Sequence, residues 1–193
     1  MREQRRARHT FLVAWAVLVL VRLLLAVRLP LFVDEAFYWQ ESRHLAWAYS
    51  DLPGLTAWLI RLGTALAGDS LLGVRWPFLL LAAALPWLMR AAARPLGPRR
   101  AWQVGTLVAV FPLSGLLGIL ALPDVPLNFA AALCLVGGVR AVQKPDWRAS
   151  AWLAAGLLVG GLSHYRFLGV LGVGVLALSS LSQGRRVLRE PRV

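Results

Sequence analysis

The chain has 193 residues, of which 59% are hydrophobic and 16% charged, and its mean hydropathy is +0.64. Soluble domains carry about 25% charged residues, so this composition excludes an ordinary soluble domain and indicates an integral membrane protein. The net charge of +12 does not indicate a nucleic-acid-binding domain, because the basic residues fall in short clusters between apolar runs.

Apolar segments recur along the chain. The first follows a basic N-terminus, but it is too long for a cleaved signal peptide and no small-x-small cleavage site follows it, so we expect a retained span. Only helices satisfy their own backbone in lipid at these lengths, so the sequence predicts an all-α, polytopic bundle of about six transmembrane helices. The segments are 11–29, 71–88, 102–122, 127–142, 151–162 and 167–181. The last two share a short stretch and must be short, tilted or a broken pair.

The charge distribution predicts the orientation. With the N-terminus in the cytoplasm, every loop on that side is basic, as the positive-inside rule requires, and most acidic residues lie opposite. The basic clusters are Arg2, Arg5, Arg6 and Arg8; Arg90, Arg94, Arg99 and Arg100; Arg140, Lys144 and Arg148; and Arg185, Arg186, Arg189 and Arg192. We expect one transmembrane domain over residues 1–193 in a bacterial inner membrane, with cytoplasmic tails at 1–9 and 184–193.

Residues 30–70 form a long outer loop. We expect a helix over 35–49, capped by Asp34 and ended by the Pro53-Gly54 turn, and a second helix over 55–66. Both are expected to lie in the membrane interface, as a lid over a cavity at membrane level.

The loop begins with an acidic pair, Asp34 and Glu35, followed by three aromatic residues. Aromatic side chains favour the membrane–water boundary, and ionisable groups held close to hydrocarbon are costly and usually functional. We therefore interpret 30–70 as the active-site loop.

Other outer turns add polar groups at the same predicted depth. They are Asp124, between two prolines, the pair His164 and Arg166, and Arg75 just below. Carboxylates and cations that converge at a membrane face suit transfer from a phosphate-bearing lipid. A carboxylate can take the proton of an acceptor hydroxyl, and guanidinium groups can stabilise phosphate charge.

Each of these residues is also consistent with a plainer role. Asp34 suits a helix cap, Glu35 a solvated interface, and Asp124 a turn cap. Arg75 suits a side chain that extends to the membrane surface or pairs with an acid.

Metal chemistry is not expected. The single cysteine, Cys134, lies in an apolar run, so no internal disulfide and no cysteine metal cluster can form. The outer loops offer no His/Cys cluster, and arginines can carry the phosphate charge, so we expect no metal and no cofactor. A divalent-ion site with oxygen ligands at Asp34, Glu35 and Asp124 stays an open alternative.

Several motifs together carry a family resemblance. They are Asp34-Glu35-Ala36-Phe37-Tyr38-Trp39, Ser42-Arg43-His44-Leu45-Ala46, Asp51-Leu52-Pro53-Gly54, Gly68-Asp69-Ser70, Val74-Arg75-Trp76-Pro77, Leu122-Pro123-Asp124-Val125-Pro126 and Ser163-His164-Tyr165. In this order they resemble the dolichyl-phosphate-mannose–protein mannosyltransferase-like family. That family includes the bacterial lipid A aminoarabinose transferases and belongs to the C-type glycosyltransferases.

The resemblance implies a function. Asp34 matches the catalytic base, Glu35 its acidic partner, and Asp124 the second acidic motif at the mouth of the site. The implied reaction moves a sugar, with inversion, from a polyprenyl-phosphate carrier to a hydroxyl of a lipid, glycan or protein acceptor on the outer face. The residues expected to contact substrates are Asp124, Arg75, His164, Arg166 and Asp51.

The chain departs from the family pattern at three points. His164 replaces a common lysine, which leaves Arg166 or a protonated His164 to contact phosphate, and Gly54 replaces a second proline. Relatives also continue for several more spans, so we expect this chain to be the N-terminal part of a longer enzyme.

The alternative is a non-catalytic polytopic protein, a transporter or an assembly subunit. A transporter would place ionisable groups near the midplane, whereas these carboxylates lie at one face.

Overall fold

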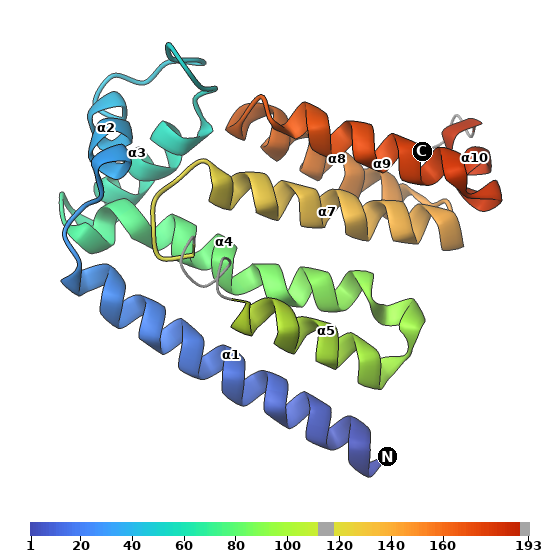
Figure 1. The fold of residues 1–193 in the computed structure, drawn as a ribbon. Coiled ribbons are helices and arrows are strands. Elements are labelled where there is room, and N and C mark those ends of the chain that lie inside the picture. The colour runs from blue at the N-terminus through green and yellow to red at the C-terminus, as the bar shows by residue number, and fades with distance from the viewer. Residues whose placement is uncertain (112–117, 190–193) are drawn as a thin grey trace.

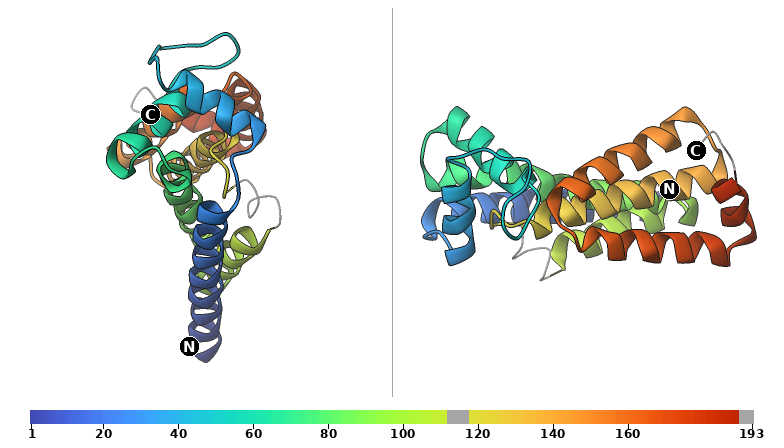
Figure 2. Two further views of the ribbon diagram at one scale, coloured as in Figure 1. Left: turned by 90° about the vertical axis from the view of Figure 1, so that its left-hand side faces the viewer. Right: turned by 90° about the horizontal axis from the view of Figure 1, so that it is seen from above.

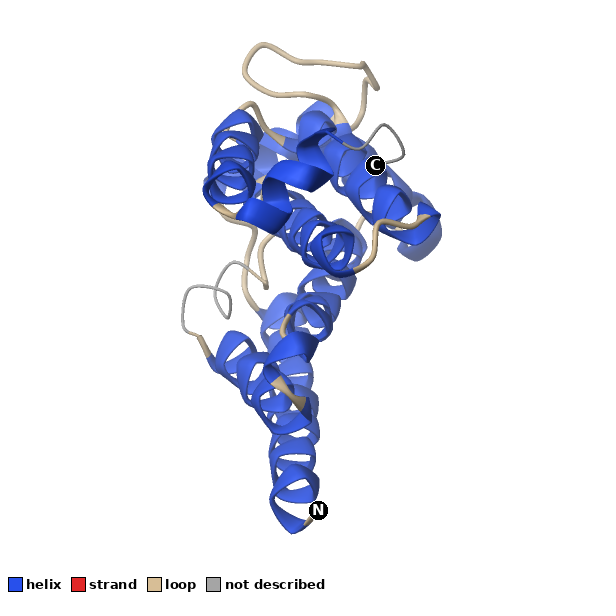
Figure 3. Ribbon diagram, turned by 90° about the vertical axis from the view of Figure 1, so that its right-hand side faces the viewer, coloured by secondary structure: helices blue, strands red, loops and turns tan. Residues whose placement is uncertain are grey.

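The computed structural model describes residues 1–111 and 118–189 (Figure 1). In these residues all regular structure is helical, apart from one antiparallel bridge between Ala48 and Pro53, which agrees with the predicted all-α class (Figure 3). The elements are α1 (Arg2–Arg28), α2 (Val33–Glu41), α3 (Leu55–Ala67), α4 (Leu71–Ala92), the 3-10 turn η1 (Arg94–Leu96), α5 (Pro98–Val110), α7 (Asp124–Gln143), α8 (Trp147–Ser163), α9 (Phe167–Ser180) and α10 (Ser182–Arg189).

Three of the described helices, α1, α4 and α7, are long and apolar enough to cross a membrane. A fourth span is possible if α9 and α10 act together, although the two are bent by 115° at their junction. The prediction of six spans is therefore not confirmed. The predicted third helix, 102–122, is wrong at its C-terminal end, because α5 stops at Val110 and residues 118–122 are not helical. Residues 112–117 of that segment lie outside the described residues.

The long helices lie roughly side by side and separate two ends of the molecule (Figures 1 and 2). One end, here called the site end, holds α2, α3, the loop 42–54, the start of α7 and the α8–α9 turn. The other, the basic end, holds the N-terminus, the α4–α5 and α7–α8 turns and α10. The described residues of the four basic clusters thus gather at one end of the bundle, as the predicted topology requires, and Arg192 lies outside the described residues.

Aromatic packing joins α1, α4 and α5 near the basic end. Phe11 is fully buried, and its ring lies 4.8 Å from that of Trp87 and 5.2 Å from that of Trp102. The guanidinium of Arg90 lies over the Trp102 ring at 3.6 Å, a distance that suits a cation–π interaction. This cluster ties the first span to the α4–α5 hairpin.

At the site end, α3 packs tightly on α4. A Cβ atom on Gly63 would collide with the Gly73 carbonyl oxygen, so only glycine permits this approach. The Trp76 indole N–H donates to the Gly63 carbonyl at 3.1 Å. Buried residues of α2, α3 and α4, among them Tyr38, Ile60 and Phe78, form a shared core beneath the loop. The observed α3 agrees with the predicted helix over 55–66, whereas an interfacial position for α2 and α3 is not confirmed.

The prediction of a helix over 35–49 is wrong, because α2 ends at Glu41. The Ser42 hydroxyl donates to the Trp39 carbonyl at 2.6 Å and takes up one of the last carbonyls of the helix. The Tyr49 hydroxyl lies within hydrogen-bond distance of two backbone carbonyl oxygens, that of Glu41 at 3.1 Å and that of His44 at 3.0 Å. These side-chain bonds replace the next helical turn.

Candidate active site

Glu35 and Arg75 form a fully enclosed ion pair that joins α2 to α4. Both side chains are 0% exposed, and their closest contact, Arg75 Nη2 to Glu35 Oε2, is 2.6 Å. The Arg75 Nε–H also donates to Glu35 Oε1 at 2.7 Å, which makes the pair bidentate. The remaining Arg75 N–H groups donate to the carbonyl oxygens of Ala26, Leu29 and Pro30, each at 2.8 Å.

The Glu35 carboxylate accepts two further bonds, from the backbone N–H groups of Phe32 at 2.9 Å and Ala121 at 2.8 Å. Burial acts to raise the pKa of Glu35, but the hydrogen bonds from Arg75, Ala121 and Phe32 outweigh it and hold the pKa below its ordinary value. The pair thus links the end of α1, α2, α4 and the segment before α7. The alternative of a solvated Glu35 is wrong, and the alternative of an acid-paired Arg75 is confirmed.

Asp34 occupies a contrasting position one residue earlier. Successive helical side chains point about 100° apart, so when Glu35 faces the core its neighbour faces outward. Asp34 is exposed and forms no hydrogen bond or ion pair with any other described residue. It is not the helix cap that its position suggested, because α2 begins at Val33 and the Glu35 carboxylate takes up the Phe32 N–H. Its carboxylate is therefore available to a ligand.

Four carboxylates act together on the Tyr38 hydroxyl. Burial, followed by the charges of Asp51, Asp34, Glu41 and Asp124, raises the pKa of Tyr38 to about 12. The structure thus brings the predicted residues Asp34, Asp51 and Asp124 into one neighbourhood. Burial and the charge of Asp51 also raise the pKa of Glu41. Tyr38 and Glu41 were not predicted as site residues, because nothing in their spacing distinguished them from core or surface positions.

Asp124 and Arg166 form an exposed counterpart of the buried pair. Arg166 Nη1 lies 3.5 Å from Asp124 Oδ1, and the side chains are 63% and 34% exposed. Asp124 is the first residue of α7 and makes no capping bond, so the turn-cap alternative is wrong for its side chain. A carboxylate in the first helical turn still interacts favourably with the helix dipole. Both groups lie where an incoming ligand can reach them.

His164 is buried beside this pair. Its side chain Nδ1 accepts the backbone N–H of Arg166 at 3.1 Å, which requires an unprotonated nitrogen. Burial and the Arg166 charge lower the pKa of His164, although Asp124 and Asp51 act in the opposite direction. A neutral His164 does not supply a cation for phosphate, so of the two candidates in this turn Arg166 is the better one.

The loop 42–54 is a fixed structure above the site. The Trp58 indole N–H donates to the Ala46 carbonyl at 2.8 Å, and the Gly54 N–H donates to the Trp47 carbonyl at 2.9 Å. A Cβ atom at position 54 would lie 2.5 Å from the Ala46 carbonyl oxygen, which explains glycine at this departure from the family pattern. The Trp47 side chain stays 78% exposed and packs edge-on against Trp58. Sequence reasoning missed this loop, because its bonds join residues with no shared periodicity.

Metal ligands do not gather here. Within residues 1–111 and 118–189, no group of three or more His, Cys, Asp or Glu side chains is placed to hold a metal ion. The independence of the chemistry from metals stays a prediction.

Comparison with known proteins identifies similar sequences. Residues 51–193 match the family model described as dolichyl-phosphate-mannose-protein mannosyltransferase. The chain is also 32% identical over 164 residues to a lipid A galacturonosyltransferase (RgtD) of Rhizobium johnstonii. That alignment covers 82% of this chain but only 34% of the relative, so the chain spans about a third of the length of the curated relative it matches. No solved structure gives a significant match.

Proposed function

Because this chain belongs to the dolichyl-phosphate-mannose–protein mannosyltransferase family, a family of membrane glycosyltransferases, we propose that it takes part in sugar transfer from a polyprenyl-phosphate carrier to a hydroxyl acceptor. The similarity to a lipid A galacturonosyltransferase favours a lipid-linked glycan as acceptor and a sugar acid as one candidate donor. The basic end faces the cytoplasm in this proposal, and the site end faces outward.

The observation that carries the proposal is the free carboxylate of Asp34 within a group of acids around Tyr38, one of which, Asp124, contacts the Arg166 guanidinium. Asp34 takes the proton from the acceptor hydroxyl, and the oxygen attacks the anomeric carbon. The bond from that carbon to the carrier phosphate breaks on the opposite side, which inverts the configuration. Arg166 gives up its 3.5 Å contact with Asp124 and stabilises the negative charge of the departing phosphate instead.

Glu35 and Arg75 have a different role in this proposal. They are enclosed and bonded to each other, so neither touches a substrate. Their bonds fix the first turn of α2 against α1 and α4 and so set the direction of the Asp34 side chain. We propose that both are positioning residues.

The test follows a labelled sugar from a polyprenyl-phosphate donor to a lipid-linked acceptor in membranes. Two forms are compared: residues 1–193 alone, and the same residues extended by any coding sequence that continues in frame past Val193. We expect the shorter form to bind the carrier weakly and to transfer nothing, because the site end offers few cations for a phosphate. Transfer by the extended form, lost on Asp34→Asn, supports the proposal. A non-catalytic role is indicated if no form transfers sugar from any donor.

A further inference from the structure

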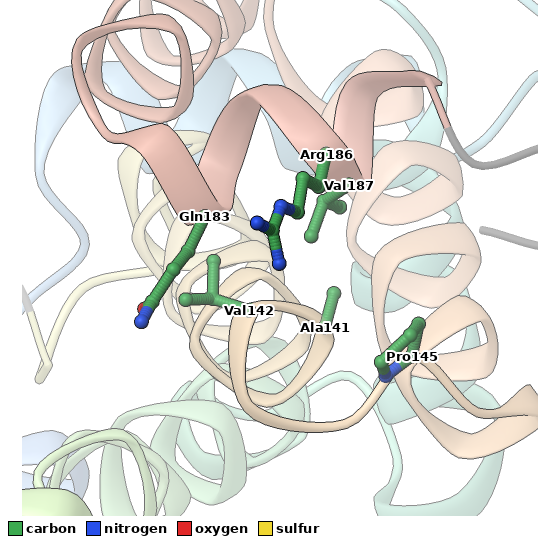
Figure 4. A pocket seen from close by; sticks show the side chains of 6 residues that line it. All are labelled: Ala141, Val142, Pro145, Gln183, Arg186 and Val187. Carbon is green, nitrogen blue, oxygen red and sulfur yellow. The ribbon is translucent and has the colours of Figure 1, made fainter.

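A cavity with a mixed polar and apolar lining lies at the basic end, far from the acidic group of the site end. Its volume is about 350 Å³, and it lies between the C-terminal end of α7, the turn that follows α7, and α10 (Figure 4). It is lined by Ala141, Val142, Pro145, Gln183, Arg186 and Val187. Nothing in the proposed sugar transfer uses it.

The bend between α9 and α10 builds this cavity. A Cβ atom at Gly184 would collide with the Leu178 carbonyl, so glycine permits the sharp 115° turn. Val187 then packs with Ala141 and Ala149, which fastens α10 across the ends of α7 and α8. As a result the Arg186 guanidinium points down into the cavity, toward Val142 and Ala141 (Figure 4).

Arg186 has no acceptor in the described part of the chain, 1–111 and 118–189. Its neighbours do: Arg140 forms a bidentate pair with Asp146, at 3.0 and 2.8 Å, and Arg185 donates to the Ser179 carbonyl at 2.9 Å. Arg186 is exposed, so its guanidinium is accessible to an anion that enters the cavity. Planar N–H groups match the oxygens of a phosphate particularly well.

We propose that this cavity binds the headgroup of an anionic phospholipid. The phosphate accepts from the Arg186 guanidinium and the Gln183 amide, while the glycerol backbone lies against Val142 and Pro145. A lipid fits better than a free phosphate, because much of the lining is apolar and the cavity opens at the end of a helix long enough to cross the membrane. Basic pockets at this level between spanning helices are suited to acidic lipids.

The test uses the chain of residues 1–193, solubilised in a mild detergent. Retention of phosphatidylglycerol and of phosphatidylcholine is compared by native mass spectrometry. We expect a clear preference for phosphatidylglycerol, and about tenfold weaker binding of that lipid to Arg186→Gln, which loses a charged hydrogen bond. The matched control is Arg185→Gln, which removes the same charge from the same helix but does not line the cavity, and it should bind as the unmodified chain does.

Each contrary outcome is informative. Equal losses in the two variants would show general attraction between basic residues and acidic lipid, and would overturn the site. Displacement of the lipid by equimolar glycerol 3-phosphate would assign the cavity to a soluble phosphate instead. If Arg186→Gln fails to fold, the comparison of the two lipids on the unmodified chain still tests the proposal. Equal retention of phosphatidylglycerol and phosphatidylcholine would contradict it.

Discussion

Two of the carboxylate–guanidinium pairs at the site end differ in almost every physical respect. Glu35 and Arg75 are 0% exposed and meet at 2.6 Å, whereas Asp124 and Arg166 are 34% and 63% exposed and lie 3.5 Å apart. A buried charge must be fully bonded, and every N–H of Arg75 has an acceptor. An exposed pair is bound weakly and can exchange partners. The comparison separates residues that hold the site together from residues that can meet a ligand.

The largest expected effect is loss of stability on breaking the buried pair. Arg75→Met leaves the Glu35 carboxylate enclosed without its counter-charge, which should lower the free energy of unfolding by about 3–5 kcal/mol. The same substitution at Arg166 should cost only about 0–1 kcal/mol. Unfolding of the two variants in detergent, monitored by tryptophan fluorescence, gives the comparison directly. Equal stability of both would contradict the positioning role of the buried pair.

The second expected effect is a loss of sugar transfer that leaves the stability of the protein unchanged. Asp34→Asn keeps the size of the side chain but removes its basicity, so sugar transfer should fall about 10²-fold or more. Since Asp34 is exposed and unbonded to other described residues, the variant should unfold like the parent. Glu41→Gln is a suitable control, because it removes a carboxylate of the same group near Tyr38. Near-normal turnover of Asp34→Asn in a transferring form would rule out Asp34 as the base.

This contrast was only partly accessible from the sequence. Asp34 and Glu35 are adjacent acids, and the family resemblance implied a catalytic role for Asp34 as the base and for Glu35 as its acidic partner. Which of them is buried depends on Arg75, forty residues later, and on the Ala121 N–H, 86 residues away. Such pairings depend on tertiary packing and leave no local signal.

Other elements were predictable because their determinants are local. The helix α3 lies between the Pro53-Gly54 turn and Gly68, whose φ of 75° favours glycine, and most of its residues are apolar. The end of α2 at Glu41 was not predicted. It depends on side-chain hydrogen bonds, from Ser42 to the Trp39 carbonyl and from Tyr49 to the Glu41 and His44 carbonyls, which stabilise a loop where the helix was expected to continue. Residues 42–49 contain no proline or glycine, so the sequence carries no helix-breaking signal after Glu41.

A smaller effect is expected at the exposed pair itself. Arg166→Gln removes a cation that the proposed mechanism uses to receive phosphate charge, so transfer should fall about tenfold. The loss should appear with little change in unfolding, unlike that of Arg75→Met. The test compares transfer rates at saturating and at low carrier concentration. A matched change at Arg43, whose exposed guanidinium pairs with Asp69 at 3.1 Å, should leave the rate unaltered.

The smallest effect is a pH dependence of stability at His164. Burial and the Arg166 charge lower its pKa in the folded protein, so the unfolded chain binds a proton more readily there. The stability contributed by neutral His164 is therefore complete above its unfolded pKa of about 6.5 and is lost as the pH falls through the lower folded value. Protonation also removes the acceptor of the Arg166 N–H and places two cations side by side. The parent should lose more stability than His164→Gln between pH 7.5 and 5.5, and because the two proteins differ only at this residue, the difference isolates His164. Parallel pH profiles would mean that the pKa of His164 is the same in the folded and the unfolded chain, which would contradict this prediction. A smaller loss in the parent than in His164→Gln would mean that the fold favours protonated His164, which could then contact a phosphate.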